Sequence, residues 1–360
     1  MEIVPAKIVF VVLGSILLLI SVLPLVRNDN WIFRIFEYPR SQKLILNLIL
    51  FTGFLFFIDL NSMWEIVFAS LMLANIGYLT YQIWPYTIFS KHQIQKTAQI
   101  DGERQFKLFI ANVYQENRDV KSCLKSIAEN DPDTILLVET DQWWKNELDK
   151  ELLKRYPFQI AKAISNTYGM VLYSRLKLID PCIKFLIEKD IPSIHTKVML
   201  PSGEIFKLYG LHPKPPVPHE TARSTERDAE ILLVAKEAKE SKLPVVVAGD
   251  LNDVAWSYTT ELFLKVSRLL DPRRGRGFFN TFNAHYWYLR WPLDHVFCSK
   301  HFHLTTLKRL PPIGSDHFPI LICLALAGER AAENEGEMLK ANTEEEAVAT
   351  EKVRSGMAAH

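Results

Sequence analysis

Residues 8–26 form an uncharged apolar run, IVFVVLGSILLLISVLPLV, which is long enough to cross the hydrocarbon core of a bilayer as a helix. Two further apolar runs follow at about 44–58 and 66–84. Aromatic residues near the ends of the runs, such as Trp84, suit the membrane–water interface. A secretory signal peptide is the alternative interpretation of the first run; against it, the run is too long and lacks a small-residue cleavage pattern. The sequence therefore predicts a membrane anchor with three transmembrane helices within residues 1–90.

The distribution of basic residues predicts the orientation of this anchor. The first loop carries Arg27, Arg34, Arg40 and Lys43, whereas the second loop has no Lys or Arg. The positive-inside rule then places the first loop, and everything after about residue 90, in the cytoplasm. On this count the protein is a multi-pass protein of the cell (inner or plasma) membrane with a cytoplasmic domain.

Beyond a predicted linker at 91–104, the chain changes to short apolar runs separated by turns. Strands that alternate with helices over 105–326 indicate an α/β layered domain. Residues 327–360 are rich in Glu and Ala with few large apolar residues, so we expect a disordered tail. The predicted strands of the domain cover residues 106–111, 134–138, 169–174, 195–200, 205–211, 245–249, 294–298 and 318–324. The predicted helices cover residues 119–130, 140–154, 221–241 and 258–268.

Charge and cysteine usage narrow the functional classes only slightly. The net charge of +1 gives no strongly basic footprint for nucleic acid. The four cysteines, Cys123, Cys182, Cys298 and Cys323, lie far apart without CxxC spacing. They indicate neither a zinc site nor a disulfide framework.

Polar side chains recur where the predicted strands end or begin. Taken singly, each is most simply a turn former, a helix cap or a packing residue. Their repetition at the rims of a rigid sheet instead predicts a catalytic site. Carboxylate and amide oxygens suit Mg²⁺ or Mn²⁺, and histidines beside carboxylates supply acid–base partners. Together these groups fit phosphoester hydrolysis. The residues are Asn112, Glu139, His212, Asp250, Asn252, Asp294, Asp316 and His317.

The order of the motifs resembles the endonuclease/exonuclease/phosphatase superfamily. The matching stretches are ANVYQENRD, DTILLVET, YGMVLYSR, LHPKPP, VVVAGDLND, PLDHVF and GSDHFPI, spread over about 105–325. With three spans ahead of it, the chain looks like the membrane-anchored bacterial branch. The resemblance implies a four-layer α/β sandwich, in which two packed mixed sheets are flanked by helices. It also favours an extracytoplasmic domain, against the charge count.

The resemblance implies a role for each site residue. Glu139 matches the direct ligand of Mg²⁺ or Mn²⁺, with Asn112 as its partner and Asp316 as a second carboxylate on the metal side. Asp250 and Asn252 match the pair that orients or activates water and contacts the phosphate. His212 matches the group that stabilises the transition state or protonates the leaving oxygen. His317 matches the general base, and Asp294 the acid that orients it.

Two arginines and one basic loop are further candidates for phosphate contacts. Arg223 and Arg227 could reach a phosphate from the helix that follows HPKPP, although exposed helix charges are usually solvated. The loop RRGRGFF at 273–279 is either a substrate-contacting loop or a solvated one.

These observations predict a membrane-anchored, metal-dependent phosphoesterase with a nuclease-like site. The substrate is either nucleic acid or a membrane-borne phosphate, such as a polyprenyl pyrophosphate or a phospholipid headgroup. The low positive charge gives little of the phosphate attraction usual in nucleases. The alternative from another class is a non-catalytic membrane scaffold, which loss of Glu139, Asp250 or His317 would have marked. The predicted partners are the phosphate-ester substrate and the lipid bilayer, and no protein partner is predicted.

Overall fold

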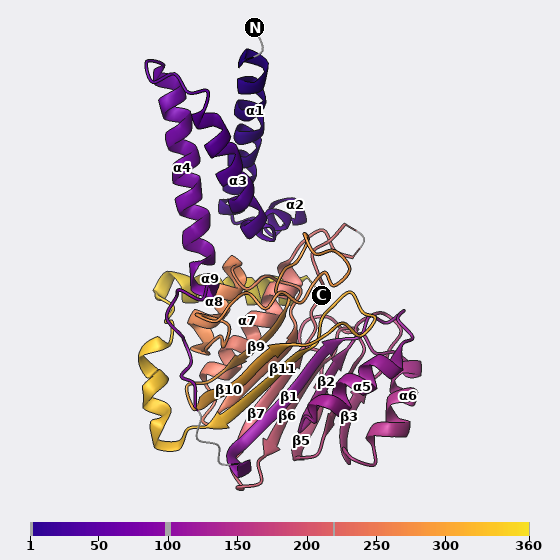
Figure 1. Cartoon of the computed structure of the whole chain (residues 1–360). Coiled ribbons are helices and arrows are strands. Elements are labelled where there is room, and N and C mark those ends of the chain that lie inside the picture. The colour runs from indigo at the N-terminus through magenta and orange to yellow at the C-terminus, as the bar shows by residue number, and fades with distance from the viewer. Residues whose placement is uncertain (1–2, 98–101, 219, 360) are drawn as a thin grey trace.

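The computed structural model describes residues 3–97, 102–218 and 220–359. Three helices project from one side of a layered α/β domain (Figure 1). They are α1 (Ile3–Val22), α3 (Arg40–Leu55) and α4 (Met63–Ile83), and the short helix α2 (Trp31–Arg34) lies between α1 and α3. Short 3₁₀ helices occupy η1 (Leu23–Leu25), η2 (Ile35–Glu37), η3 (Trp84–Tyr86), η4 (Gly102–Arg104) and η5 (Gly328–Glu337).

Six strands form the first sheet, in the order β10-β11-β1-β2-β4-β3. The central strands β1 and β2 run parallel, and the other neighbours run antiparallel. The sheet is therefore mixed. Its strands are β1 (Gln105–Asn112), β2 (Thr134–Val138), β3 (Phe158–Lys162), β4 (Met170–Ser174), β10 (Phe302–Arg309) and β11 (Ile320–Leu326).

Five strands form the second sheet, in the order β5-β6-β7-β8-β9. This sheet repeats the pattern of the first, because only β7 and β8 are parallel. Its strands are β5 (Lys177–Lys184), β6 (Ser193–Met199), β7 (Ile205–Leu211), β8 (Val245–Asp250) and β9 (Asp294–Cys298).

The alternation of side chains along the strands builds four layers. In β1, Leu108 and Ile110 face the second sheet, whereas Phe109 and Ala111 face the helices on the other side. The first sheet is covered by α5 (Val120–Asn130) and α6 (Gln142–Leu152), and the second by α7 (Thr225–Lys239), α8 (Tyr258–Ser267) and α9 (Thr343–Ala358). The predicted arrangement of two mixed sheets between helices is thus confirmed.

Three strands, β3, β5 and β10, are not predicted from the sequence. Each lies at the edge of its sheet. An edge strand is only partly covered, so its side chains are mixed in polarity; β3 and the end of β10 are largely half-buried or exposed. The apolar runs that identify central strands are therefore absent.

Two helical segments among the described residues are long and apolar enough to span a membrane, Ala6–Leu25 and Met63–Tyr86. The second predicted span, at 44–58, falls on α3. This helix has 16 residues and rises about 24 Å, less than the hydrocarbon thickness of about 30 Å. Its first two turns carry buried Arg40, Lys43 and Asn47, which hold it to its neighbours.

Most of the predicted tail at 327–360 is helical and not disordered, with η5 over Gly328–Glu337 and α9 over Thr343–Ala358. Helix α9 begins with a capping box between Asn342 and Glu345 and packs against α7. The contact depends on small residues, since a Cβ on Gly356 would lie 2.3 Å from the Cβ of Ala229. Small side chains let two helices pack closely without the large apolar residues that the prediction required.

The predicted linker at 91–104 also differs from expectation in its first half. Ile94 is fully buried in the core between the sheets, and the backbone N–H of Thr97 donates to the carbonyl of Leu304 at 3.0 Å. This segment therefore extends the domain, while residues 98–101 lie outside the described residues.

Candidate active site

The two parallel strand pairs bring the predicted residues to one edge of the molecule. Asn112 ends β1 and Glu139 follows β2, while His212 follows β7 and Asp250 ends β8. Parallel neighbours end at the same side of a sheet, so Asn112 and Glu139 share one side of the first sheet, and His212 and Asp250 share one side of the second. Asp294 joins them because β9 runs antiparallel to β8, with Asp294 opposite Asp250.

An amide bridges the two halves of this edge. The Nδ2 of Asn112 donates to Glu139 Oε1 at 2.7 Å and to Asp250 Oδ2 at 3.1 Å. Its Oδ1 accepts the backbone N–H of Tyr114 at 2.9 Å, which fixes the orientation of the amide. In this arrangement the amide N–H group of Asn112 faces the carboxylates, and its role at the metal stays a prediction.

Glu139 itself is held in a strained position. Its φ of 58° lies in the left-handed region, which is unfavourable for a residue with a long side chain. The carboxylate also accepts the backbone N–H of Gln115 at 3.2 Å. Backbone strain of this kind persists only where the surroundings enforce it, and it concentrates at functional sites.

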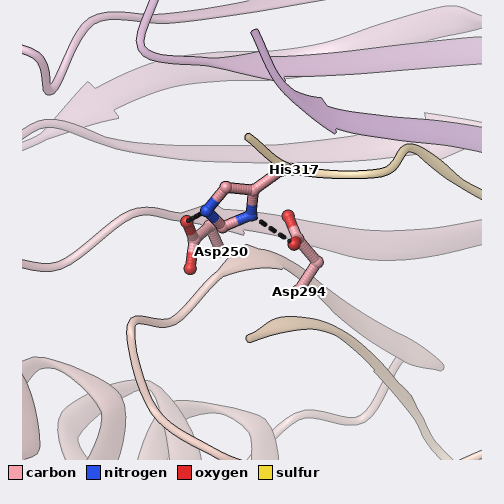
Figure 2. Close-up of side chains that lie close together, drawn as sticks. All are labelled: Asp250, Asp294 and His317. Carbon is pink, nitrogen blue, oxygen red and sulfur yellow. Dashed lines mark hydrogen bonds and ion pairs between the residues drawn. The ribbon is translucent and has the colours of Figure 1, made fainter. Parts of the chain in front are cut away.

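His317 lies between two carboxylates (Figure 2). Its Nδ1 bonds to Asp294 Oδ2 at 2.8 Å, and its Nε2 lies 3.6 Å from Asp250 Oδ2. The carboxylate of Asp294 thus fixes the proton on Nδ1 and turns Nε2 toward Asp250. The predicted pairing of His317 with Asp294 is present.

The charges of this group depend on one another. Burial raises the pKa of Asp250 to about 7, although the charge of His317 opposes the shift. Burial lowers the pKa of His317, but Asp294 and Asp250 raise it more, to about 10. Burial likewise raises the pKa of Glu139. Near neutral pH the proton therefore resides on His317, and Asp250 is the group that titrates.

The site carries more negative than positive charge. Among the described residues, no Lys or Arg forms an ion pair with Glu139, Asp250, Asp294 or Asp316. Histidines lie beside two of these carboxylates: His212 and His317 beside Asp250, and His317 beside Asp294. Four carboxylates share this site with one protonated imidazole, and uncompensated negative charge in a buried site is costly, which fits a site built to receive a cation. Oxygen donors of this kind suit Mg²⁺ or Mn²⁺.

Two groups of side chains could hold that cation. Ligand atoms of Asp250, Asp294 and His317 lie within 4.8 Å of one another. These three groups, however, already contact each other through the imidazole nitrogens. Glu139 and half-buried Asp316, whose charge acts on the Glu139 carboxyl, retain oxygen atoms for a cation.

His212 is buried beside Asp250, with its Nε2 at 3.9 Å from Asp250 Oδ2. Burial lowers the pKa of His212 to about 3, so the ring is neutral. Its Nδ1 has no hydrogen-bond partner among the described residues. A neutral ring can donate a hydrogen bond to a phosphate oxygen, which favours the predicted stabilising role over proton donation to the leaving group.

The two predicted arginines do not enter this site. Arg227 is fully buried, where it pairs with Asp228 at 2.9 Å and donates to the carbonyl of Asn252 at 2.6 Å. Arg223 is exposed, and its backbone pairs with Asn30. The expected phosphate contact is therefore wrong for Arg227, and no contact brings Arg223 to the site within the described chain.

The basic loop at 273–279 is structural. Arg273 pairs with Asp271 at 2.7 Å, and Arg274 pairs with Glu261 at 2.7 Å. Both arginines are buried. Their guanidinium groups hold the loop to the domain, and they do not form a phosphate cradle.

Two residues that contact the site residues, Tyr38 and Phe282, are not predicted from the sequence. Tyr38 donates its hydroxyl to the carbonyl of Asn252 at 2.9 Å, and the ring of Phe282 lies 5.0 Å from that of His317. Neither residue belongs to a motif. No local signal identifies them, because their partners lie far away in the sequence.

Known proteins are similar to this chain in sequence or in fold. A UPF0294 protein of Vibrio campbellii is 23% identical over 288 residues, covering 73% of this chain and 98% of the relative. Danio rerio TDP2 complexed with a single-strand DNA product has a TM-score of 0.51 at 16% identity, over 61% of this chain and 98% of that one. The human Nocturnin catalytic domain with bound sulfate has the same TM-score and identity, over 63% and 97%. At these identities the likeness concerns the fold.

A family model described as the endonuclease/exonuclease/phosphatase family matches residues 110–317, which is more than half of the chain. The matched segment begins within β1 and ends at His317, so it includes every strand end described above. The chain therefore belongs to the endonuclease/exonuclease/phosphatase family.

Proposed function

We propose that this protein is a membrane-anchored, divalent-metal-dependent phosphoesterase. The observation that carries the proposal is the linked group of Asp294, His317 and Asp250 on the same edge as Glu139. It combines a proton acceptor, a cationic imidazole and a carboxylate that lacks a Lys or Arg partner among the described residues. A phosphoester hydrolase requires these elements together.

The residues divide the chemistry between them. Asp250, with its pKa near 7, accepts a proton from the attacking water, because a base works best when its pKa lies near the working pH. The imidazolium of His317, oriented by Asp294, faces the negative phosphate. Asn252 and neutral His212 donate hydrogen bonds to phosphate oxygens. A cation held by Glu139 and Asp316 would neutralise charge on the phosphate and the leaving oxygen.

The membrane anchor is part of the proposal. Helices α1, α3 and α4 carry outward-facing apolar residues, among them Leu19, Ile49 and Leu73, each more than half exposed. Exposed apolar surface of this extent suits a bilayer rather than water. Close helix packing supports retention of α1 over its removal as a signal sequence, since a Cβ on Gly14 would lie 2.7 Å from the ring of Phe68.

One observation favours a membrane-borne phosphate over nucleic acid. The segment Tyr286–Tyr288 exposes three aromatic rings, with Trp287 79% exposed. The carbonyl of Tyr288 accepts a hydrogen bond from Gln42 at the start of α3, where the predicted anchor meets the domain. Aromatic rings at this level are typical of the membrane interface. A phospholipid headgroup or polyprenyl pyrophosphate would reach the site by lateral diffusion.

The substrate class is tested with the full-length protein in bilayer nanodiscs containing Mg²⁺. Phospholipid, polyprenyl pyrophosphate, DNA and RNA are supplied separately, with Asp250→Asn as the inactive control. We expect phosphate release from a membrane-borne substrate and none from the variant. Hydrolysis of DNA or RNA alone would assign the protein to the nucleases, and hydrolysis of none would contradict the enzymatic proposal.

A further inference from the structure

The segment between α1 and α3 docks on the domain beside the site. The backbone N–H of Trp31 donates to the carbonyl of Ala222 at 2.9 Å. Arg34 is buried and pairs with Asp228 at 3.0 Å. Residues 28–40, which we call the anchor loop, therefore form part of the domain surface and do not lie free at the base of the helices.

The hydroxyl of Tyr38 contacts a site residue directly. It donates to the carbonyl of Asn252 at 2.9 Å, and the same carbonyl accepts Arg227 Nη1 at 2.6 Å. Asn252 has a φ of 50°, in the left-handed region, and its N–H donates to Asp250 Oδ1 at 2.9 Å. The peptide that carries Asn252 is thus held in a strained conformation by Tyr38 on one side and Asp250 on the other.

The ring of Tyr38 reaches the opposite side of the site through two aromatic neighbours. It packs edge-on against Trp291 with centroids 5.8 Å apart, and Trp291 stacks on Phe282 at 6.0 Å. Phe282 in turn contacts the ring of His317 at 5.0 Å. One side chain of the anchor loop therefore supports both Asn252 and His317.

We propose that Tyr38 is a positioning residue and that the anchor loop completes the active site. This inference rests on the proposed function, and it adds that the segment between the first two helices of the anchor is required for the geometry of the site. The hydroxyl sets the peptide of Asn252, and the ring sets His317. The two contributions are separable. Tyr38→Phe removes only the hydroxyl contact with Asn252, whereas Tyr38→Leu also removes the ring that packs on Trp291.

Tyr86 provides a matched control. It is also a buried tyrosine from the predicted anchor, and its hydroxyl donates to the carbonyl of Ala255, three residues after Asn252. Tyr86→Phe therefore removes the same kind of bond from the same loop of the domain. It leaves the hydrogen bond of Tyr38 to Asn252 and that of Asp294 to His317 in place.

The test measures kcat, KM and the pH profile of full-length protein in nanodiscs, with bis(p-nitrophenyl) phosphate and Mg²⁺ as the probe. We expect Tyr38→Phe to lower kcat about fivefold, with an unchanged KM and pH profile. Tyr38→Leu should lower kcat on the order of 100-fold and shift the profile, because His317 moves. Tyr86→Phe should keep the wild-type kcat and profile despite a similar loss of thermal stability.

Wild-type kcat and pH profiles in both Tyr38 variants would overturn the inference, as would an equal loss of kcat in Tyr86→Phe. A wild-type protein that hydrolyses nothing would contradict the proposed function separately. In that case the inference is tested by the increase in melting temperature that inorganic phosphate and Mg²⁺ produce in each variant. We expect a smaller rise in Tyr38→Phe than in Tyr86→Phe; equal rises, or no rise in the wild type, would overturn it.

Discussion

His317 lies between Asp294 and Asp250, and the order of these three side chains decides where protons reside. Asp294 accepts the Nδ1 proton, so Nε2 is the nitrogen that faces Asp250. Both carboxylates raise the pKa of His317 above that of Asp250, so we propose Asp250 as the base and the imidazole of His317 as the cation. The resemblance alone implies that His317 is the general base and that Asp250 and Asn252 orient or activate the water.

We predict that Asp294→Asn lowers kcat by roughly 10²-fold, because the imidazole loses its orienting partner and part of its charge stabilisation. The pH profile of kcat should shift in the same variant. The double variant with His317→Ala should be little slower than the slower single variant, since the two residues act as a unit. Losses that multiply would show that they act separately.

The pH dependence of stability provides a test away from the site. Burial lowers the pKa of His195 to about 3, with smaller contributions from Lys184 and Lys207. Below about pH 6.5, His195 is protonated in the unfolded state but stays neutral in the folded state. The free energy of unfolding therefore falls as the pH drops from 6.5 toward 3. At pH 5 this one histidine should cost about 2 kcal/mol. His195→Gln should flatten the loss of unfolding free energy between pH 7 and 5, and an unchanged slope would contradict the assignment.

Much of the candidate site could be predicted from the sequence because its residues are tied to strand ends. Glu139 and Asp250 stand at the ends of central apolar runs, so each can be placed at a strand end, while the packing of the two sheets that brings these ends together is implied only by the resemblance. The role of Arg227 could not be predicted, because a helix pattern does not show which face the rest of the chain covers. The contact of Tyr38 with Asn252 was equally hidden, since the two residues lie over 200 positions apart.

At the scale of elements, helix α9 shows where composition misleads. Its sequence is rich in Glu and Ala, yet Ala349 and Val353 are buried and Gly356 meets Ala229. Ion pairs such as Lys239–Glu346, at 2.6 Å, connect it to α7. The composition of such a charged helix predicts disorder, but its narrow stripe of small residues allows close packing, which orders the helix.

We predict that Gly356→Leu lowers the stability of the protein by about 1–3 kcal/mol, because the added side chain forces α9 away from α7. Gly336→Leu is the control, since Gly336 has open space at its Cβ position and is exposed. Thermal unfolding of the two full-length variants gives the comparison. Equal melting temperatures would indicate that α9 does not dock.

At the scale of the whole molecule, the docked anchor loop constrains topology. In the proposed membrane anchor, residues 28–40 contact the domain, so the loop between α1 and α3 would lie on the same side of the membrane as the site and the turn between α3 and α4 on the other. The basic residues used to predict a cytoplasmic domain include Arg34, Arg40 and Lys43, which are buried against protein partners. The side that the domain occupies stays a prediction.

The free cysteines allow that prediction to be tested without a fusion. Cys182 is exposed, whereas Cys123, Cys298 and Cys323 are buried. For a cytoplasmic domain, we predict that a membrane-impermeant maleimide labels Cys182 only after spheroplasts are lysed. Asn61→Cys in a Cys182→Ser background should be labelled from outside. Labelling of Cys182 in intact spheroplasts would place the domain on the extracytoplasmic side.

The central claim is that a divalent cation on the Glu139 side of this site supports phosphoester hydrolysis. The most direct test titrates Mg²⁺ and Mn²⁺ into EDTA-treated full-length protein and into Glu139→Gln, which keeps the size of the side chain and removes its charge. We predict that the wild type regains hydrolysis of bis(p-nitrophenyl) phosphate and a higher melting temperature with metal. The variant should regain neither, with a rate at least about 100-fold lower. Full activity in excess EDTA, or a wild-type response from Glu139→Gln, would contradict the account.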